Sequence, residues 1–310
     1  MMIADPQAPP GTAAWQQLRS FDGTAIAWRA DGFQAQRLPV VLCNGIACSD
    51  EYWQHIVAPL AADRRVVRWD YRAHGRSGAP ADPQQVTVTA VARDLEAVMA
   101  AAGIQQAVLV GHSFGVQVAL EAARSLGERA AGLVVIAGAP GAPLRVVPAL
   151  LGLPVATALG AAAPSLFGAA WQRACRSPSA YWIARTLGAT TRNAPRDVMD
   201  AYFAHVEHLD PATMLRMLGA MQAHSAADVL DGLTVPLLAI AGDADALTPV
   251  RTMRQMTLRA PDAELEVVAG GSHTLPAEQP AAVLAAMTPF LARVDAALPS
   301  AEASCAANDR

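Results

Sequence analysis

The sequence predicts an α/β protein with a mostly parallel, doubly wound sheet. Short, nearly continuous apolar runs alternate along the chain with longer segments whose apolar residues recur at helical spacing. Several of these runs end at Gly or at a small polar residue, as at Asn44-Gly45 and at Gly111. Strands that are apolar throughout are buried on both faces, which is typical of a parallel sheet covered by helices on its two sides.

The first 140 residues contain most of the predicted elements. Strands are expected at 25–30, 39–43, 65–69, 107–110 and 133–137, and helices at 52–60, 88–99 and 114–126. The helix at 88–99 places Val88, Val91 and Leu95 on one face and is expected to stop at Gly103. In this part of the chain, strands and helices alternate as crossover connections require.

Residues 139–228 interrupt the alternation. They contain no strand pattern and are predicted to form several helices broken by Pro and Gly. Beyond them, strands are expected at 236–241 and 264–268, and helices at 248–259 and 277–294. A parallel crossover needs only about a dozen residues, so this segment is interpreted as an inserted helical domain. The expected organisation is a core of 15–138 and 229–298, an insertion of 139–228, and flexible tails at 1–14 and 299–310.

Composition and charge exclude several classes of protein. A hydrophobic fraction of 53% with 16% charged residues excludes a disordered chain. A net charge of −4 leaves no basic surplus for nucleic acid. Every basic residue is Arg, so the chain has neither a phosphate-loop Gly-Lys motif nor a lysine for Schiff-base chemistry. No cofactor is expected.

The sequence gives no signal for export or for membrane insertion. Residues 146–171 carry no charge, but Pro148, Pro154 and Pro164 interrupt them, which favours short helices over a transmembrane span. The four cysteines are scattered and suit neither a zinc site nor a disulfide framework. The N-terminal residues lack the features of a secretory signal. We therefore expect a cytoplasmic protein with no transmembrane span.

The segment Gly111–Gly115 has the Gly-x-Ser-x-Gly pattern of a nucleophile elbow. It follows a predicted buried strand and opens a predicted helix, which is the context that the elbow requires. Such a turn exposes the Ser113 hydroxyl above the sheet and directs the helix N-terminus at a developing oxyanion. The alternative is a glycine-rich turn whose serine only caps the helix. We predict that Ser113 is a nucleophile and that the Phe114 N–H donates to the oxyanion.

A serine nucleophile needs a base and an orienting acid, which follow it in the chain in the order acid, then His. His273 lies in a glycine-rich loop after the last predicted strand and is the candidate base. His205 and His208 have metal-pair spacing, but no third ligand is suitably placed, so no metal is expected. Two acids, Asp243 and Asp245, follow the strand at 236–241, and the residues alone leave both open, with Asp245 farther out on the loop.

A second oxyanion donor is expected from the loop after the strand that ends at Cys43. Gly45 allows the backbone to approach the substrate closely, which makes the Ile46 N–H the candidate donor.

These motifs together resemble the α/β-hydrolase-fold proteins over about residues 20–295. The residues that carry the resemblance are Asn44-Gly45-Ile46, Trp53, Asp70–Ser77, Gly111–Gly115, Gly242, Asp245, Pro249 and Gly271-Ser272-His273. The resemblance implies that Asp245 is the acid, that Ile46 is the second donor, and that a helical cap follows the sixth core strand.

The chain departs from the usual pattern of these proteins at three positions. Asn44 stands where most relatives have His. An Asn at this position is a feature that resembles the enol-lactone hydrolases of aromatic degradation. Ala73 and Val116 stand where a glycine is usual. A serine nucleophile argues against the dehalogenase and epoxide hydrolase branches, which use Asp.

The expected function is hydrolysis of a carboxylic ester that carries a hydrophobic acyl or aromatic group. Apolar residues are abundant in the insertion, and cap residues normally line the pocket. The predicted substrate-binding residues are Asn44, Trp171, Trp182 and Leu247. The alternatives are a lactone hydrolase, a carbon–carbon bond hydrolase, and a non-catalytic ligand receptor on the same fold. The expected partner is a small hydrophobic ester or lactone substrate, and no nucleic acid.

Overall fold

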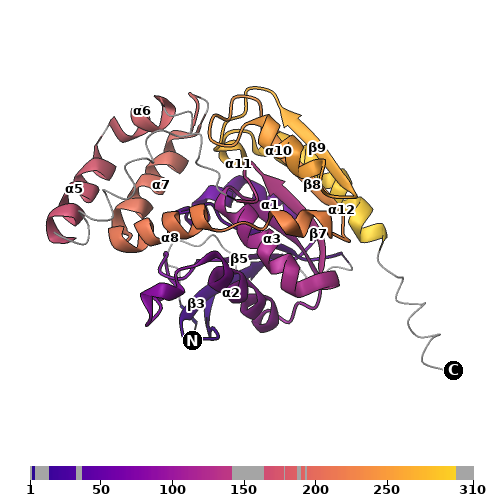
Figure 1. Ribbon diagram of the computed structural model, residues 1–310, viewed down its shortest axis with the longest axis horizontal. Helices are drawn as coiled ribbons and strands as arrows, with labels where there is room; N and C mark the ends of the chain where they lie inside the picture. Colours follow the sequence, from indigo (N-terminus) through magenta and orange to yellow (C-terminus); the bar gives the residue numbers. More distant parts are fainter. Residues whose placement is uncertain are drawn as a thin grey trace.

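The computed structural model describes residues 2–3, 14–32, 37–141, 164–177, 179–186, 190–192 and 194–297. These residues form a nine-stranded sheet in the order β1-β2-β3-β5-β4-β6-β7-β8-β9 (Figure 1). The strands are β1 Met2–Ile3, β2 Trp15–Arg19, β3 Ala25–Asp31, β4 Val40–Cys43, β5 Val66–Trp69, β6 Ala107–His112, β7 Ala130–Ile136, β8 Leu237–Gly242 and β9 Ala263–Val268.

The sheet is mostly parallel. The six strands from β5 to β9 in that order pair in parallel, whereas β1, β2 and β3 form an antiparallel edge. This confirms the predicted fold class. The register pairs Cys43 with Gly111, so the loops that follow β4 and β6 begin side by side at the carboxyl edge of the sheet.

Two strands at the antiparallel edge were not predicted from the sequence. β1 pairs Ile3 with Trp15 of β2, so part of the predicted N-terminal tail joins the sheet. β2 contains two glutamines and an arginine, and only Trp15 is fully buried in it. β2 lies near the edge of the sheet, between β1 and β3, and lacks the continuous apolar run that identifies a central strand.

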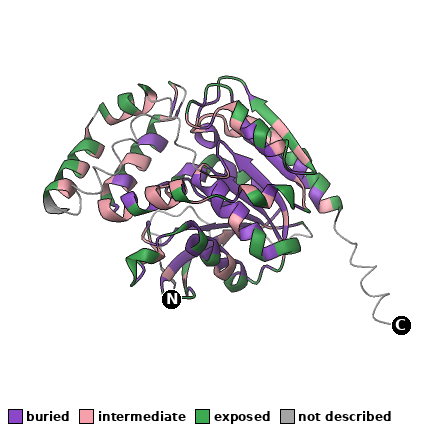
Figure 2. Ribbon diagram, in the orientation of Figure 1, coloured by how far each residue is buried: buried purple, intermediate pink, exposed green. Residues whose placement is uncertain are grey.

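Helices cover both faces of the sheet. The helices of the core are α1 Gln54–Ala61, α2 Val88–Ala101, α3 Phe114–Leu126, α9 Ala227–Asp231, α10 Val250–Thr257, α11 Leu275–Glu278 and α12 Pro280–Ala296. Short 3-10 turns lie at Asp50–Trp53 (η1), Pro83–Gln85 (η2) and Gly127–Arg129 (η3). Successive residues of β4 point to opposite layers: Val41 faces α2, α3 and α10, and Val40 faces α1, α11 and α12. Figure 2 shows the buried strands between these layers.

The predicted helix at 277–294 is divided in the structure. The short helix α11 ends at Glu278, and α12 starts afresh at Pro280. Proline fits the first position of a helix because the N–H group that it lacks would have no intrahelical acceptor there.

Among the described residues, four further helices lie between β7 and β8. They are α5 Pro164–Arg176, α6 Ser179–Thr186, α7 Arg196–His208 and α8 Pro211–Ala223. Helices α5, α6 and α7 lie to one side of the sheet in Figure 1, and α8 packs on the core through Met217 and Met221. Val206, Leu209 and Met214 of this group pack on Ala47 of the loop after β4. These helices therefore contact the carboxyl edge of the sheet. The limits of the cap at 139 and 228 remain a prediction.

The two ends of this insertion are held together. Gly141 and Ser225 form an isolated antiparallel bridge, and the Ala226 N–H donates to the Pro140 carbonyl at 2.8 Å. Most of the uncharged stretch 146–171 lies outside the described residues. None of the described helices combines the length and apolar character that crossing a bilayer requires.

Candidate active site

Ser113 lies at a strained turn between β6 and α3. Its backbone has φ 53° and ψ −114°, in a region that side chains other than glycine seldom occupy. The two flanking glycines permit this turn. A side chain on Gly111 would overlap the Gly115 backbone, and one on Gly115 would overlap the Cys43 carbonyl group. The sharp turn leaves Ser113 half-buried at the carboxyl edge of the sheet.

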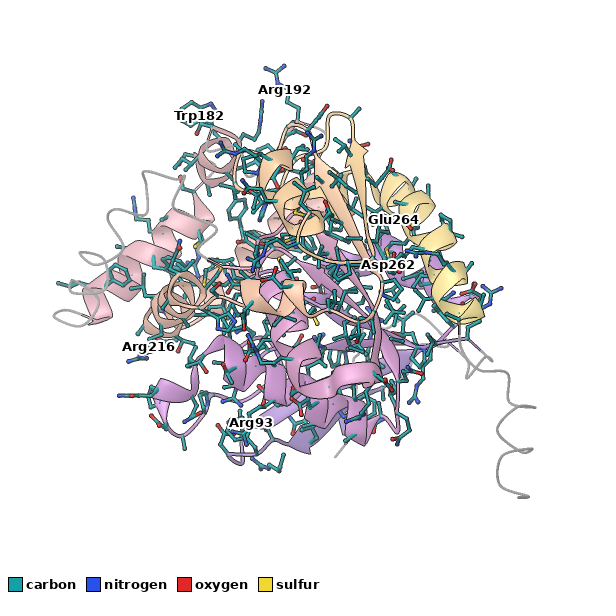
Figure 3. All side chains as sticks on the ribbon, turned by 45° about the vertical axis from the view of Figure 1, so that its right-hand side comes forward. Arg93, Trp182, Arg192, Arg216, Asp262 and Glu264 are labelled. Carbon is teal, nitrogen blue, oxygen red and sulfur yellow. The ribbon has the colours of Figure 1, made fainter. Side chains whose placement is uncertain are left out.

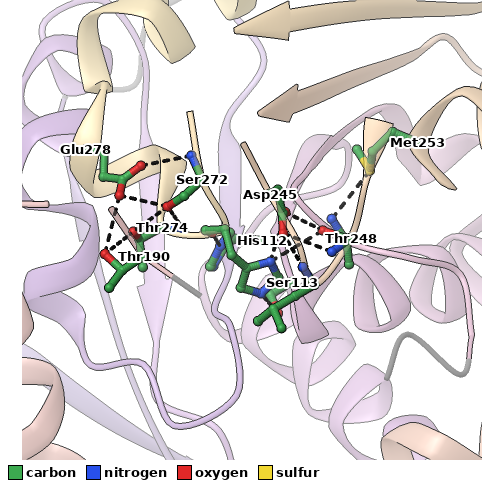
Figure 4. Close-up of polar contacts among 12 residues, drawn as sticks. His112, Ser113, Thr190, Asp245, Thr248, Met253, Ser272, Thr274 and Glu278 are labelled. Carbon is green, nitrogen blue, oxygen red and sulfur yellow. Dashed lines mark hydrogen bonds and ion pairs between the residues drawn. The ribbon is translucent and has the colours of Figure 1, made fainter. Parts of the chain in front are cut away.

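His273 links Ser113 to Asp245, both of which are labelled in Figure 4. Its Nε2 lies 2.8 Å from Ser113 Oγ, and its Nδ1 lies 3.0 Å from Asp245 Oδ2. Because a carboxylate only accepts, Nδ1 carries the proton and donates to Asp245, which leaves Nε2 free to accept from the serine hydroxyl. The three side chains come from three loops that follow β6, β8 and β9.

Asp245 is a buried carboxylate whose other lone pairs are occupied. It accepts from the N–H groups of Leu247 and Thr248 at 2.8 and 2.9 Å, and from the Thr248 hydroxyl at 2.6 Å. Burial raises its pKa, but the attraction of His273 and the hydrogen bonds from His273 and Thr248 outweigh burial and lower it to about 2. Asp245 is therefore ionised at neutral pH.

Asp243 is placed differently. It is exposed and accepts from the Gly270 N–H at 2.6 Å, which braces the turn before His273. Of the two acids that the sequence left open, the structure brings Asp245 to His273.

His112 holds the loop that carries His273, a contact that sequence reasoning did not identify. The ring is 2% exposed, and its Nε2–H donates to the His273 carbonyl oxygen at 2.8 Å. Burial lowers the pKa of His112 to about 3, so the ring is neutral. It also stacks on the ring of Tyr52 at a centroid distance of 4.8 Å. No sequence signal separates this role from that of an ordinary buried histidine.

Phe114 directly follows Ser113, and Ile46 lines the same cavity as Ser113. Ile46 follows Gly45 in the loop after β4, and Phe114 is the first residue of α3. Among the described residues, neither N–H donates to a protein acceptor. The first N–H groups of a helix have no intrahelical partner, so the Phe114 N–H is free to bind an anionic oxygen.

The predicted substrate-binding residues divide into two groups. Trp171 and Leu247 line the cavity beside Ser113. Asn44 does not line it: its amide accepts from Trp53 Nε1 at 2.5 Å and donates to the Trp69 carbonyl at 3.3 Å. Trp182 is also absent from the lining and is 63% exposed, pointing outward in Figure 3.

The cavity has a volume of about 430 Å³ and mostly apolar walls. Its described lining contains no Asp, Glu or Arg. The residues that line it are Gly45, Ile46, Cys48, Tyr52, His112, Ser113, Trp171, Ala174, Cys175, Ala180, Ile183, Ala184, Thr190, Met199, Tyr202, Phe203, Val206, Met214, Leu247, His273 and Thr274. The core supplies the polar groups around Ser113, and the insertion supplies most of the apolar wall.

His205 and His208, the two histidines with metal-pair spacing, make separate contacts in the structure. His205 stacks on His74 at a centroid distance of 6.2 Å, and His208 Nδ1–H donates to the Ala204 carbonyl at 2.6 Å. Within the part of the chain that the structure describes, no group of three or more His, Cys, Asp or Glu could hold a metal ion.

Comparisons with known proteins identify relatives of the chain and of its fold. The profile of the Alpha/beta hydrolase family matches residues 40–286. RutD of Variovorax paradoxus is 30% identical over 83% of this chain and 92% of its own length. Its name describes it as a proposed carbamate hydrolase.

Two solved structures are also similar. The esterase RhEst1 from Rhodococcus sp. has a TM-score of 0.67 and 25% identity over 90% of this chain and 99% of its own. An enol-lactonase from Burkholderia xenovorans has a TM-score of 0.69 and 22% identity over 89% of this chain and all of its own.

Proposed function

The chain belongs to the alpha/beta hydrolase family, and we propose that it is a serine hydrolase that cleaves a carboxylic ester with a hydrophobic acyl or aromatic group. The observation that carries this proposal is the hydrogen-bonded series Ser113–His273–Asp245, which opens into an apolar cavity. The similar esterase from Rhodococcus supports an ester as the substrate.

In the first half of the proposed reaction, Ser113 Oγ attacks the ester carbonyl carbon while His273 Nε2 takes the hydroxyl proton. Asp245 keeps the imidazole oriented and stabilises its cation. The carbonyl oxygen becomes an oxyanion that accepts from the N–H groups of Ile46 and Phe114. When the tetrahedral intermediate collapses, His273 gives its proton to the departing alcohol, and the acyl group stays on Ser113.

In the second half, water replaces the alcohol. His273 takes a proton from the water as its oxygen attacks the acyl carbonyl carbon, and then returns that proton to Ser113 Oγ. The carboxylic acid leaves and the enzyme is regenerated. In this proposal, residues 139–228 act as a cap whose apolar side chains exclude bulk water and hold the acyl group.

A lactone is the alternative substrate within the same mechanism. In that case the alcohol stays attached to the acyl group, so a single hydroxy acid is released. The enol-lactonase supports only a shared fold, because its identity to this chain is 22%. The name of the RutD relatives adds carbamates to the set of acyl compounds that should be compared.

The test combines a covalent probe with a substrate panel. A fluorophosphonate should label Ser113, and Ser113→Ala should lower turnover by about three orders of magnitude or more. The panel should contain p-nitrophenyl esters from acetate to decanoate, a lactone and a carbamate. Each buried methylene should add about 0.8 kcal/mol, nearly fourfold in kcat/KM, until the cavity is full.

Three outcomes would contradict the proposal. Labelling at another residue, or an active Ser113→Ala protein, would exclude the serine mechanism. A steady fall in kcat/KM from acetate onward would exclude a pocket for a hydrophobic acyl group.

A further inference from the structure

We propose that Glu278 is a positioning residue whose carboxylate joins the His273 loop to the insertion, so that His273 is aligned only when the insertion lies against the core. This inference rests on the proposed function, because it assigns His273 the role of base. It adds a residue that touches neither Ser113 nor the substrate.

The first side of this junction is the loop before His273. Glu278 accepts from the Ser272 N–H at 2.9 Å and from the Ser272 hydroxyl at 2.7 Å. The chain can do this because the Glu278 N–H bonds back to the Thr274 carbonyl at 3.0 Å, which turns α11 toward the loop. Ser272 is fully buried and immediately precedes His273. The position of Ser272 therefore fixes the backbone from which the His273 side chain extends.

The second side is the segment between α6 and α7. The same carboxylate accepts from the Thr191 N–H at 2.8 Å and lies 2.9 Å from the Thr191 hydroxyl. Thr190 Oγ1 lies 3.3 Å from it and receives a hydrogen bond from the Thr274 hydroxyl at 2.9 Å. Figure 4 shows Glu278, Thr190, Ser272 and Thr274 as one cluster beside His112. Donors from the insertion and from the His273 loop thus meet on one carboxylate.

The charge of Glu278 suits this role. Burial raises its pKa, but the hydrogen bonds from Ser272 and Thr191 outweigh burial, so the pKa lies below its usual value and the group is ionised at neutral pH. Hydrogen bonds to an ionised acceptor are roughly twice as strong as neutral ones. Thr190 and Thr274 also line the cavity, which places this junction in the wall around the substrate.

The junction matters because His273 works only within narrow limits of position. Its two hydrogen bonds, of 2.8 and 3.0 Å, must form together. A misplacement of about 1 Å in such a group can cost ~100-fold in rate. Releasing Ser272 from Glu278 should therefore lower kcat, whereas KM should change little because the carboxylate does not contact the substrate.

The test compares Glu278→Gln with Glu207→Gln, a control carboxylate that joins α5 and α7 through Arg176. We expect Glu278→Gln to lower kcat by about tenfold or more with KM within about threefold, and the control to keep both. A second readout needs no substrate. The proton between His273 and Asp245 should give a downfield NMR resonance in the wild type and in the control, and this resonance should broaden in Glu278→Gln.

Thr191→Val tests the insertion side separately, because it leaves Glu278 and both of its bonds to Ser272 in place. We expect it to lower kcat by about threefold or more, and to add nothing when combined with Glu278→Gln, since both changes act through one carboxylate. If Glu278→Gln does not fold, Thr191→Val decides the question alone.

The inference would be overturned if either Glu278→Gln or Thr191→Val had the same kcat as the wild type and also the same downfield proton resonance. If the wild type cleaves no ester, the proposed function fails, but the NMR comparison still tests how Glu278 positions His273.

Discussion

Asp245 accepts four hydrogen bonds inside the protein, whereas Asp243, two residues earlier, accepts one from Gly270 at the surface. Three of the four hydrogen bonds to Asp245 come from its own loop. These bonds orient the carboxylate independently of His273. Its low pKa follows from these donors and from His273. The two acids therefore differ in environment more than in their position along the chain.

We expect Asp245→Asn to lower kcat by about 10³–10⁴-fold, because an amide cannot hold the imidazole in the correct tautomer. Asp243→Asn should keep kcat within about threefold and reduce the free energy of unfolding by at most about 1 kcal/mol, since its amide oxygen can still accept from the Gly270 N–H and only the charge of the acceptor is lost. Steady-state kinetics and urea unfolding of the purified variants measure both. The opposite ranking of the two variants would assign the acid to Asp243.

Ser113 and His273 could be predicted because each lies in a short glycine-rich motif whose position at the end of a strand is readable locally. The directions of Asn44 and Trp182 could not be predicted. Asn44 turns to Trp53 and Trp69, and only the packing of distant segments decides this. The same applies to Glu278, whose donors from the insertion lie nearly 90 residues away in the sequence.

At the scale of elements, the strands of the parallel sheet were predicted with their ends shifted by at most three residues. Their apolar runs reflect burial on two faces. β2 was missed because it lies near the edge of the sheet and is only partly buried, and β1 was missed because its two residues depend on β2 for pairing. Local turns also differ from the usual pattern of the family, notably at Ala73.

The turn after β5 holds Ala73 in a left-handed conformation with φ 61°. This conformation costs roughly 1–2 kcal/mol for a residue with a side chain, and a glycine at this position would relieve that strain. The greater conformational freedom of glycine in the unfolded chain would cancel up to about 1 kcal/mol of this stabilisation. We therefore expect Ala73→Gly to raise the free energy of unfolding by up to about 1 kcal/mol. Ala81, exposed and with φ outside the positive range, is the control, and Ala81→Gly should be destabilising. A destabilised Ala73→Gly protein would show that the strain is absent.

The same turn brings His74 against His205 of α7. His74 Nδ1–H donates to the Arg72 carbonyl at 3.0 Å, and burial lowers its pKa to about 4. Burial also lowers the pKa of His205. The negative charge of Glu51 raises this pKa in part, and the positive charge of Arg76 lowers it further. The contact between the core and the insertion therefore contains two neutral histidines.

Because the pKa of each histidine is lower in the folded than in the unfolded protein, the unfolded chain binds more protons below about pH 6.5. The stabilisation is fully present above that pH and is lost as the pH falls toward 4. We expect the free energy of unfolding to decrease by up to about 1.4 kcal/mol per pH unit for each histidine. His74→Asn, which keeps a donor to Arg72, should reduce this slope, and the exposed His55→Asn should not. Equal slopes in urea unfolding for both variants and the wild type would contradict this account.

At the scale of the whole molecule, the core and the insertion together enclose a cavity without a charged side chain in its described lining. A substrate with a carboxylate at the end of its acyl chain would bury that charge unpaired, which costs several kcal/mol. We expect kcat/KM for p-nitrophenyl hydrogen adipate to be about 100-fold or more below that for p-nitrophenyl hexanoate. Its neutral methyl ester should recover most of the difference. Similar values for the acid and the methyl ester would indicate a cationic group at the cavity.

The bridge between Gly141 and Ser225 closes the insertion at its base, next to two strands, β7 and β8, that pair with each other directly. The hydrogen bonds between β7 and β8 are therefore made without the residues that lie between Gly141 and Ser225. The groups around Ser113 all belong to core loops, whereas most of the apolar wall belongs to the insertion. Because Thr191 of the insertion also donates to Glu278, replacing this contiguous segment with another should keep the chemistry only where the new segment supplies an equivalent donor.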